Sequence, residues 1–244
     1  MTDAELAVHL ADVAGRILVE VRRSNVFSGQ ALGVAGDQIA NEFLCRALRE
    51  HRPEDGLLSE EGNDDSKRLE KERVWIVDPV DGTREYGEAR TDWAIHIGLC
   101  VGGRPVTGAV CLPDLGIVLR SDAPVSLAEP AAPPRMVVSR TRPAAEAMRV
   151  AEAIGAEILP MGSAGAKAMA VVRGEAEIYL HTGGQYEWDS AAPVAVALGH
   201  GLHASRIDGS PLLYNQPNPY MPDLLICRPE WADTVLAEVA KLSR

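Results

Sequence analysis

The sequence predicts a protein of two halves that differ in fold class, an α+β half followed by an α/β half. In residues 1–121, two helical segments precede a run of short apolar stretches separated by Gly, Pro and Asp, a pattern typical of an antiparallel sheet. In residues 135–244, strand-length apolar stretches alternate with helical ones, which indicates an α/β arrangement. Between them, residues 122–134 contain four prolines and little periodicity, so we expect a junction between two domains there.

Two helices open the first half. Residues 3–23 place apolar side chains at steps of three and four, which makes one apolar helical face. A second helix is expected over residues 37–50, again with one apolar side. The intervening segment, residues 24–37, contains Gly29, Gly33 and Gly36, and this predicts a loop or a weak hairpin.

Short strands follow the helices. Residues 74–77 form an apolar run that ends at Asp78-Pro79, which predicts a buried strand closed by a turn. Residues 94–101, 105–112 and 116–120 predict an antiparallel meander. In the second half, strands are expected at 136–138, 178–180 and 224–227, and helices at 143–155, 164–173, 189–198 and 230–242.

Composition excludes several classes of protein. With 244 residues, 46% of them hydrophobic and 24% charged, the chain can bury a core without disulfides. Its four cysteines are far apart and form no CxxC pair, which is typical of reduced thiols in the cytoplasm. No apolar run approaches the roughly 20 residues of a membrane span. The acidic start of the chain lacks the basic region of a signal peptide, so we expect a cytoplasmic protein without a membrane partner.

The net charge narrows the partners further. A charge of −11 argues against binding nucleic acid, which needs a basic face. It is compatible with an anionic small molecule, because acidic side chains gathered in one pocket hold cations, and cations hold phosphates.

One acidic motif has the composition of a metal site. Asp78-Pro79-Val80-Asp81-Gly82-Thr83 directly follows the predicted strand, where side chains project into a crevice. Two carboxylates around a proline-fixed turn can converge on one hard divalent cation such as Mg²⁺. Gly82 lets the backbone pass close to a bound group, and the N–H groups of Gly82 and Thr83 would face an anion. The alternative is an ordinary turn, which Asp-Pro-x-Asp-Gly also forms.

Two further acidic segments strengthen the metal hypothesis. Ser59-Glu60-Glu61 ends a short apolar run, and Trp188-Asp189-Ser190-Ala191-Ala192 places an Asp at the start of an apolar helix. Taken separately, the glutamates could be a solvated edge and Asp189 a helix N-cap. Haloacid-dehalogenase-type phosphatases carry the related string Asp-x-Asp-Gly-Thr, but here two residues separate the aspartates, which argues against a covalent aspartyl mechanism.

Together the three strings resemble the inositol monophosphatase superfamily of Mg²⁺-dependent phosphatases. They stand in the family's order, and the resemblance covers nearly the whole chain, including Gly162-Ser163 with Lys167. It implies a layered α-β-α-β-α sandwich, with an antiparallel-sheet half and a smaller α/β half. It also implies two or three Mg²⁺ ions, and it allows a homodimer as well as a monomer.

Carried over to this chain, the resemblance implies a role for each matching residue. Glu60, Asp78 and the Val80 carbonyl would bind one Mg²⁺, and Asp78, Asp81 and Asp189 a second. Asp37 and Thr83 would orient and deprotonate the attacking water, and the Gly82 and Thr83 N–H groups would hold the phosphate. The chain departs from the family at Val34, where a Thr is usual, and at residues 28–31, which lack the usual Lys and Asp. In the family these positions belong to the site of the third Mg²⁺ ion, so the resemblance is weakest there.

The substrate is suggested by the segments around residues 183–189 and 214–220, which look like the actinobacterial CysQ-type branch of 3′(2′),5′-bisphosphate nucleotidases. This resemblance implies hydrolysis of the 3′-phosphate of adenosine 3′,5′-bisphosphate, with its sulfated parent as a second substrate, in sulfate assimilation. Arg140, Lys167 and His181 are the candidates for the second phosphate, Ser139 lies beside them, and Tyr186 would stack on the base. The alternatives are a broader inositol or fructose 1,6-bisphosphate phosphatase, a non-catalytic Mg²⁺- or nucleotide-binding regulator, and a structural Ca²⁺ site.

Overall fold

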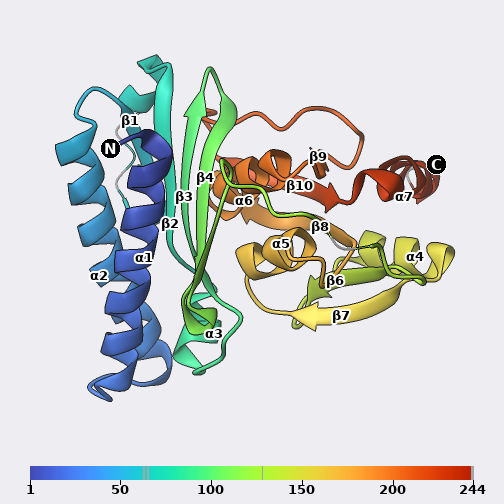
Figure 1. Ribbon diagram of the computed structural model, residues 1–244, viewed down its shortest axis with the longest axis horizontal. Coiled ribbons are helices and arrows are strands. Elements are labelled where there is room, and N and C mark those ends of the chain that lie inside the picture. The colour runs from blue at the N-terminus through green and yellow to red at the C-terminus, as the bar shows by residue number, and fades with distance from the viewer. Residues whose placement is uncertain (63, 65, 128, 243–244) are drawn as a thin grey trace.

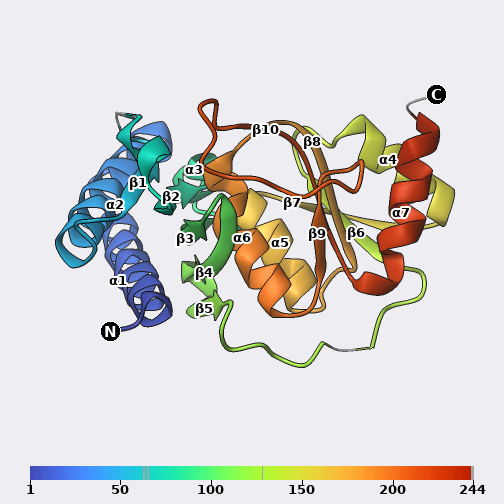
Figure 2. The same ribbon diagram turned by 90° about the horizontal axis from the view of Figure 1, so that it is seen from above.

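Five layers make up the computed structural model, which describes residues 1–62, 64, 66–127 and 129–242 (Figures 1 and 2). Helices α1 (Asp3–Arg23) and α2 (Gly29–His51) cover one face of a first sheet. Helices α5 (Ala164–Val172) and α6 (Glu187–Gly199) separate this sheet from a second one, and α4 (Ala145–Ile154) and α7 (Pro229–Leu242) cover its far side. The α-β-α-β-α sandwich expected from the sequence is therefore confirmed.

The first sheet has the strand order β1-β2-β3-β4-β5. Strand β1 (Gly56–Ser59) runs parallel to β2 (Arg73–Asp81), and the remaining neighbours are antiparallel. The predicted meander is confirmed as β3 (Ala94–Val101), β4 (Arg104–Leu112) and β5 (Ile117–Arg120). Short 3₁₀ turns, Lys67–Glu70 and Pro113–Leu115, lie in the connections.

The prediction that residues 24–37 form a loop or hairpin was wrong, because α2 already begins at Gly29. The glycines in this helix serve close packing rather than a turn. A Cβ atom on Gly36 would lie 2.5 Å from Cε1 of Tyr86, and one on Gly33 would lie 2.8 Å from Cγ2 of Thr83. Tyr86 and Thr83 belong to the short helix α3 (Thr83–Gly87), so the glycines let α2 approach the residues that follow Asp81.

The predicted turn at Asp78-Pro79 was also wrong, because β2 continues to Asp81 and the chain turns at Gly82, with φ of +88°. Between Asp78 and Asp81 the pairing with β3 is irregular: Asp78 pairs with His96, and Asp81 with Ala94. Three steps along β2 therefore match two along β3, which is a β-bulge. Since side chains alternate along a strand, the extra residue returns Asp81 to the same face as Asp78.

The second sheet has the order β7-β6-β8-β10-β9. Its central strand β8 is parallel to β6 and antiparallel to β10. The four predicted helices agree with α4 to α7 to within about two residues at each end, and the three predicted strands correspond to β6, β8 and β10. Strands β7 and β9 were not predicted. The strands are β6 (Arg135–Ser139), β7 (Glu157–Met161), β8 (Ile178–Tyr186), β9 (His203–Ser205) and β10 (Tyr220–Cys227).

Helix α6 joins the two halves. A Cβ atom on Gly98 or Gly108 of the first sheet would lie 2.9 Å or 2.5 Å from backbone atoms of Ala192, so the helix backbone rests directly on β3 and β4. One apolar cluster accordingly includes Ile76 of the first sheet and Tyr179 of the second. Division into domains at residues 122–134 stays a prediction, although the described residues of that segment contain no helix or strand.

Two expectations from composition can be compared with the structure. All four cysteines are buried free thiols. Among the described residues, no helix combines the length and apolar character that a membrane span requires.

Candidate active site

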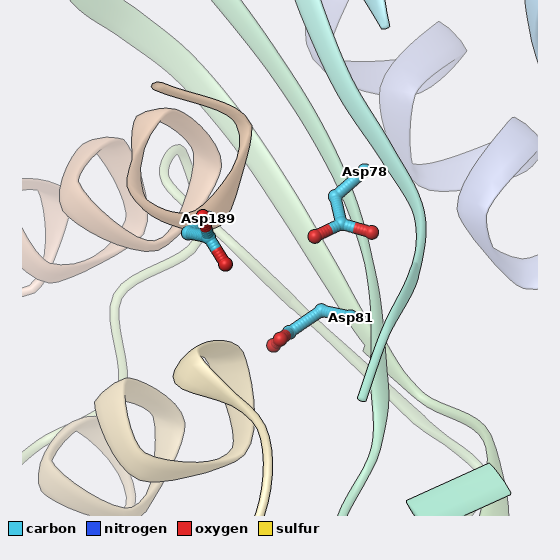
Figure 3. A group of neighbouring side chains, drawn as sticks. All are labelled: Asp78, Asp81 and Asp189. Carbon is cyan, nitrogen blue, oxygen red and sulfur yellow. The ribbon is translucent and has the colours of Figure 1, made fainter. Parts of the chain in front are cut away.

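Three aspartates from distant parts of the chain meet at one point (Figure 3). Asp78 and Asp81 lie on the bulged end of β2, and Asp189 lies in the first turn of α6. Each offers a carboxylate oxygen within 4.8 Å of the others. The helix that rests on the first sheet thus brings Asp189 to the pair that the bulge places on one face.

Asp78 lies deepest in this acidic cluster. Only 1% of its surface is exposed, and its Oδ1 atom is buried without a hydrogen-bond partner among the described residues. Burial, together with the nearby Glu60 and Asp81, raises the pKa of Asp78 well above its usual value. A buried acceptor without a donor costs free energy unless a ligand satisfies it.

Asp81 differs from Asp78 because donors surround it. Its Oδ2 accepts hydrogen bonds from the Ser163 hydroxyl at 2.7 Å and from the Gly165 N–H, and its Oδ1 accepts one from the Ala164 N–H at 3.0 Å. The His96 Nε2 atom lies 3.2 Å from Oδ2. Burial alone would raise the pKa of Asp81, but His96, the Lys167 charge and the N–H groups of α5 lower it to about 2.

Asp189 both stabilises its helix and belongs to the cluster. Helix α6 begins at Glu187, so Asp189 is the third helical residue rather than the N-cap, and its Oδ2 accepts the Tyr186 N–H at 2.7 Å. Burial and the charges of Asp81 and Glu60 raise the pKa of Asp189 to about 7. The capping and metal hypotheses are therefore compatible in this residue.

A second group of residues adjoins the cluster. The Thr83 hydroxyl lies 2.9 Å from Asp37 Oδ2 and 3.2 Å from the Val80 carbonyl oxygen. Asp37 Oδ1 is buried without a partner among the described residues, and burial and Glu61 raise the pKa of Asp37 to about 7. Glu60 follows β1, and burial of its carboxylate with Asp37 and Asp81 nearby raises its pKa to about 7.

This arrangement fits a hard divalent cation. The donors are carboxylate and carbonyl oxygens, which Mg²⁺ and Ca²⁺ prefer. The unpartnered Oδ1 of Asp78 is the clearest sign, because the described protein residues do not satisfy it and an ion beside it would. The raised pKa values of Glu60, Asp78 and Asp189 point the same way, since carboxylates that are buried, and this close together, cannot all be ionised without a compensating charge.

Beside the cluster lies a cavity of about 710 Å³. Asp81 and Asp189 of the cluster line it, as do Arg84, Glu85 and Arg142. Ser139, Lys167 and His181 also line the cavity, so three of the proposed substrate-binding residues lie where a ligand would contact them. Its glycine-rich wall is formed by Gly183 and Gly184 of β8.

The other two proposed substrate-binding residues lie elsewhere. Arg140 and Tyr186 are not among the described lining residues. The Arg140 guanidinium donates to Glu85 at 2.8 Å and to Glu88 at 2.6 Å. The Tyr186 ring stacks on Trp188, with ring centroids 4.9 Å apart and planes 9° from parallel, although the residue is exposed. We therefore expect Arg140 and Tyr186 to contribute less to substrate binding than the sequence indicated.

Lys167 and His181 line the cavity but already have partners. The Lys167 ammonium donates to the carbonyl oxygens of Gly162, at 2.8 Å, and Ser163. Burial lowers its pKa to about 8. The His181 ring nitrogen Nε2 lies 2.9 Å from the Gly183 carbonyl, and burial together with the Lys167 charge lowers the pKa of His181 to about 4.

Four residues at the site were missed by sequence reasoning: His96, Arg142, Arg84 and Gly165. His96 carries no signal in the sequence beyond its place in a predicted strand. The two arginines lack a distinctive spacing, and only the folded cavity brings them together with the acids. For Gly165, the preceding Gly162-Ser163 was a usable signal, because a glycine so near a capping serine marks a close approach at a helix start.

The raised pKa values predict how pH affects stability. For Asp37, Glu60 and Asp189 the folded pKa of about 7 exceeds the usual 3.8 or 4.5, so the folded state holds more protons and loses stability as pH rises toward 7. His181 has the opposite effect on stability, because its pKa is lowered from 6.5 to about 4. Between these two values the unfolded state holds more protons on this residue, so its contribution to stability rises with pH. A cation must displace the acids' protons, so the increase in Tm that Mg²⁺ produces over EDTA should grow from about pH 5.5 to about pH 8. An increase that shrinks over this range would contradict the prediction.

Comparison with known proteins agrees with this geometry. Residues 2–244 match the inositol monophosphatase family, and the chain belongs to that family. Among its curated relatives, the 3′-phosphoadenosine 5′-phosphate phosphatase of Mycobacterium leprae is 49% identical over an alignment of 257 residues, gaps included. The alignment covers 99% of this chain and 95% of the relative. The protein of that name from Mycobacterium bovis is 51% identical over 238 residues, or 93% and 89% of the two chains.

Solved structures confirm the fold. CysQ from Bacteroides thetaiotaomicron has a TM-score of 0.80 at 23% identity, over 93% of this chain and 97% of that one. Inositol monophosphatase II from Staphylococcus aureus has a TM-score of 0.78 at 22% identity, over 95% and 94%. The family predicted from the three acidic strings is confirmed by the match of residues 2–244.

Proposed function

We propose that the protein is a Mg²⁺-dependent phosphatase that removes the 3′-phosphate of adenosine 3′,5′-bisphosphate. The observation that carries the proposal is the cluster of Asp78, Asp81 and Asp189 beside a cavity that arginines also line. Family membership supports phosphate-ester hydrolysis, and the names of relatives at 49% and 51% identity support this substrate.

For the metal ligands we propose the residues that the family resemblance implies. Asp78, Asp81 and Asp189 would hold one Mg²⁺, and Asp78 with Glu60 and the Val80 carbonyl would hold another. Mg²⁺ held there supplies positive charge to the phosphate oxygens and favours ionisation of a water molecule. Few positive side chains among the described residues lie beside these carboxylates. We therefore propose that the main role of the cations is to neutralise the negative charge of the acidic cluster and of the phosphate.

Asp37 and Thr83 would prepare the attacking water. When the Thr83 hydroxyl donates to Asp37, its oxygen lone pairs remain free to accept a hydrogen bond from water. The water proton can then pass to the hydroxyl while Asp37 accepts the hydroxyl proton. The Gly82 and Thr83 N–H groups, at the turn after β2, would hold the phosphate for attack from the opposite side.

The second phosphate of the substrate needs a different site from the one the sequence suggested. Arg140 is paired with two glutamates, and the Lys167 ammonium is bonded to two carbonyls. Arg142 lines the cavity, is exposed, and lies close enough to His181 to lower its pKa. Arg142 is therefore our candidate for the second phosphate, whereas Arg84, which also lines the cavity, is paired with Glu88 at 2.7 Å.

Phosphate release at equal concentrations of three substrates tests the proposed function. Adenosine 3′,5′-bisphosphate should be hydrolysed with a kcat/KM at least about 10²-fold above inositol 1-phosphate and fructose 1,6-bisphosphate, a difference of about 2.7 kcal/mol in the transition state. Comparable rates on all three would instead support a broad phosphatase. No turnover of any substrate with Mg²⁺ would support a non-catalytic regulator.

Arg142→Ala tests the site of the second phosphate. Loss of one charge-assisted bond at an exposed position should raise KM for adenosine 3′,5′-bisphosphate about tenfold. KM for adenosine 3′-monophosphate should not change, because that substrate lacks the second phosphate. Arg140→Ala is the matched control and should alter neither value. Equal increases for both substrates would remove Arg142 from this role.

A further inference from the structure

His96 occupies a central position that the proposed mechanism does not use. It lies on β3 opposite Asp78, its side chain is fully buried, and one ring nitrogen lies beside each half of the acidic cluster. Nε2 is 3.2 Å from Asp81 Oδ2. Nδ1 is 3.0 Å from the carbonyl oxygen of Trp188, the residue before Asp189. The ring therefore spans the gap between the end of β2 and the start of α6.

The contacts determine how the ring is oriented. A carbonyl oxygen can only accept a hydrogen bond, so Nδ1 must carry a proton and donate it to Trp188. Nε2 then faces the Asp81 carboxylate at 3.2 Å in a contact that is not a hydrogen bond, and the two groups form an ion pair when Nε2 carries a proton as well. The start of α5 closes the remaining side, because a Cβ atom on Gly165 would lie 2.0 Å from Nε2. The imidazole is thus confined by three elements and has little freedom to turn away.

Donors around Asp81 are unevenly distributed. The Ser163 hydroxyl, the Gly165 N–H and His96 all face Oδ2, whereas Oδ1 accepts the Ala164 N–H. A carboxylate oxygen has two lone pairs, so Oδ1 keeps one available for a cation. The crowding at Oδ2 fixes the rotation of the carboxylate and hence the direction in which that lone pair points.

We propose that His96 is a positioning residue, which holds the Asp81 carboxylate in its cation-binding orientation and ties it to the start of the helix that carries Asp189. This inference rests on the proposed function only in that the ligand is a divalent cation. Outer contacts of this kind commonly change metal affinity about 10- to 100-fold when they are removed.

Two substitutions separate the two contacts of the ring. The amide nitrogen of Asn takes nearly the place of Nδ1, so His96→Asn keeps the donor to Trp188 and loses the contact with Asp81. The amide nitrogen of Gln takes nearly the place of Nε2, so His96→Gln keeps a polar contact with Asp81 and loses the bond to Trp188 that orients it. His200→Asn is the matched control, because His200 is also buried, and its Nδ1 lies 2.9 Å from the Val196 carbonyl near the far end of α6.

The experiment measures Mn²⁺ binding to the full chain by electron paramagnetic resonance, without substrate, beside Tm in EDTA. His96→Asn should raise the Mn²⁺ Kd about tenfold or more, His96→Gln should give an intermediate Kd, and His200→Asn should bind like the wild type. A merely structural role would lower Tm in EDTA and leave the Kd of the folded variants unchanged.

Three results would overturn the inference: a wild-type Kd for His96→Asn, a wild-type Kd for His96→Gln, or an equal loss in His200→Asn. If His96→Asn does not fold, His96→Gln alone decides between the outcomes. Failure of the wild type itself to bind Mn²⁺ is a different result, since it would contradict the metal-dependent function as well.

Discussion

Asp78→Asn should nearly abolish phosphate release and at the same time make the metal-free protein more stable. Asp78 is the ligand common to both proposed ions, and it is almost completely buried. Loss of its charge should lower kcat/KM by more than roughly a hundredfold, the upper range for residues that only support a ligand. In EDTA the buried Asp78 carboxyl, close to Glu60, Asp81 and Asp189, must either carry a charge or take up a proton at neutral pH, whereas Asn needs neither, so Tm should rise.

These opposite signs distinguish a functional site from a damaged fold. Phosphate release and Tm in EDTA should be measured on the same preparation, with Asp223→Asn as the matched control. Asp223 is also buried, but it pairs with Arg206 at 2.6 Å outside the cluster, so its loss should lower Tm and leave kcat/KM unchanged. More than a few per cent of wild-type activity in Asp78→Asn would exclude it as the shared ligand.

The fold was predictable wherever local pattern and tertiary packing agree. The meander β3 to β5 and the amphipathic helices α1 and α7 follow from periodicity alone. The start of α2 does not, because Gly33 and Gly36 usually disfavour a helix and are explained only by their contacts with Thr83 and Tyr86.

The end of β2 and the whole of β7 were not predicted, for related reasons. In β2, Asp78-Pro79 has the composition of a turn, and only the pairing with β3 shows that it is a bulge within the strand. Strand β7 contains Pro160 and lies at the sheet edge beside β6, where a strand needs neither a continuous apolar run nor every N–H group.

At the site, the acidic residues could be predicted from the sequence, whereas the arginines and the histidine beside them could not. Asp78, Asp81 and Asp189 stand in strings whose combination and order match one family, and the structure brings all three to one point. Arginines and a histidine carry no such signature. Whether Arg140 or Arg142 is free depends on where Glu85 and Glu88 lie, and this is a property of the folded surface.

The roles of Asp37 and Thr83 can be separated from metal binding. Thr83 is held on two sides: its hydroxyl bonds to Asp37, and its methyl group packs so closely on α2 that a Cβ atom on Gly33 would lie 2.8 Å from it. Val has the shape of Thr without the hydroxyl, so Thr83→Val keeps the packing and removes only the group that would receive the water proton. Thr83→Ser keeps the hydroxyl and loses the methyl group.

Thr83→Val should therefore lower kcat by roughly 10²- to 10⁴-fold, the usual contribution of a positioned acid or base. Thr83→Ser should retain most of the activity, with a modest loss because its hydroxyl can rotate away from Asp37. Mn²⁺ binding should be unchanged in both variants, in contrast to Asp78→Asn, because the proposed ligands are intact. If kcat of Thr83→Val stays within about tenfold of the wild type, the hydroxyl does not take part in proton transfer. Asp37 would then have to accept the water proton directly, through the Oδ1 atom that has no partner among the described residues.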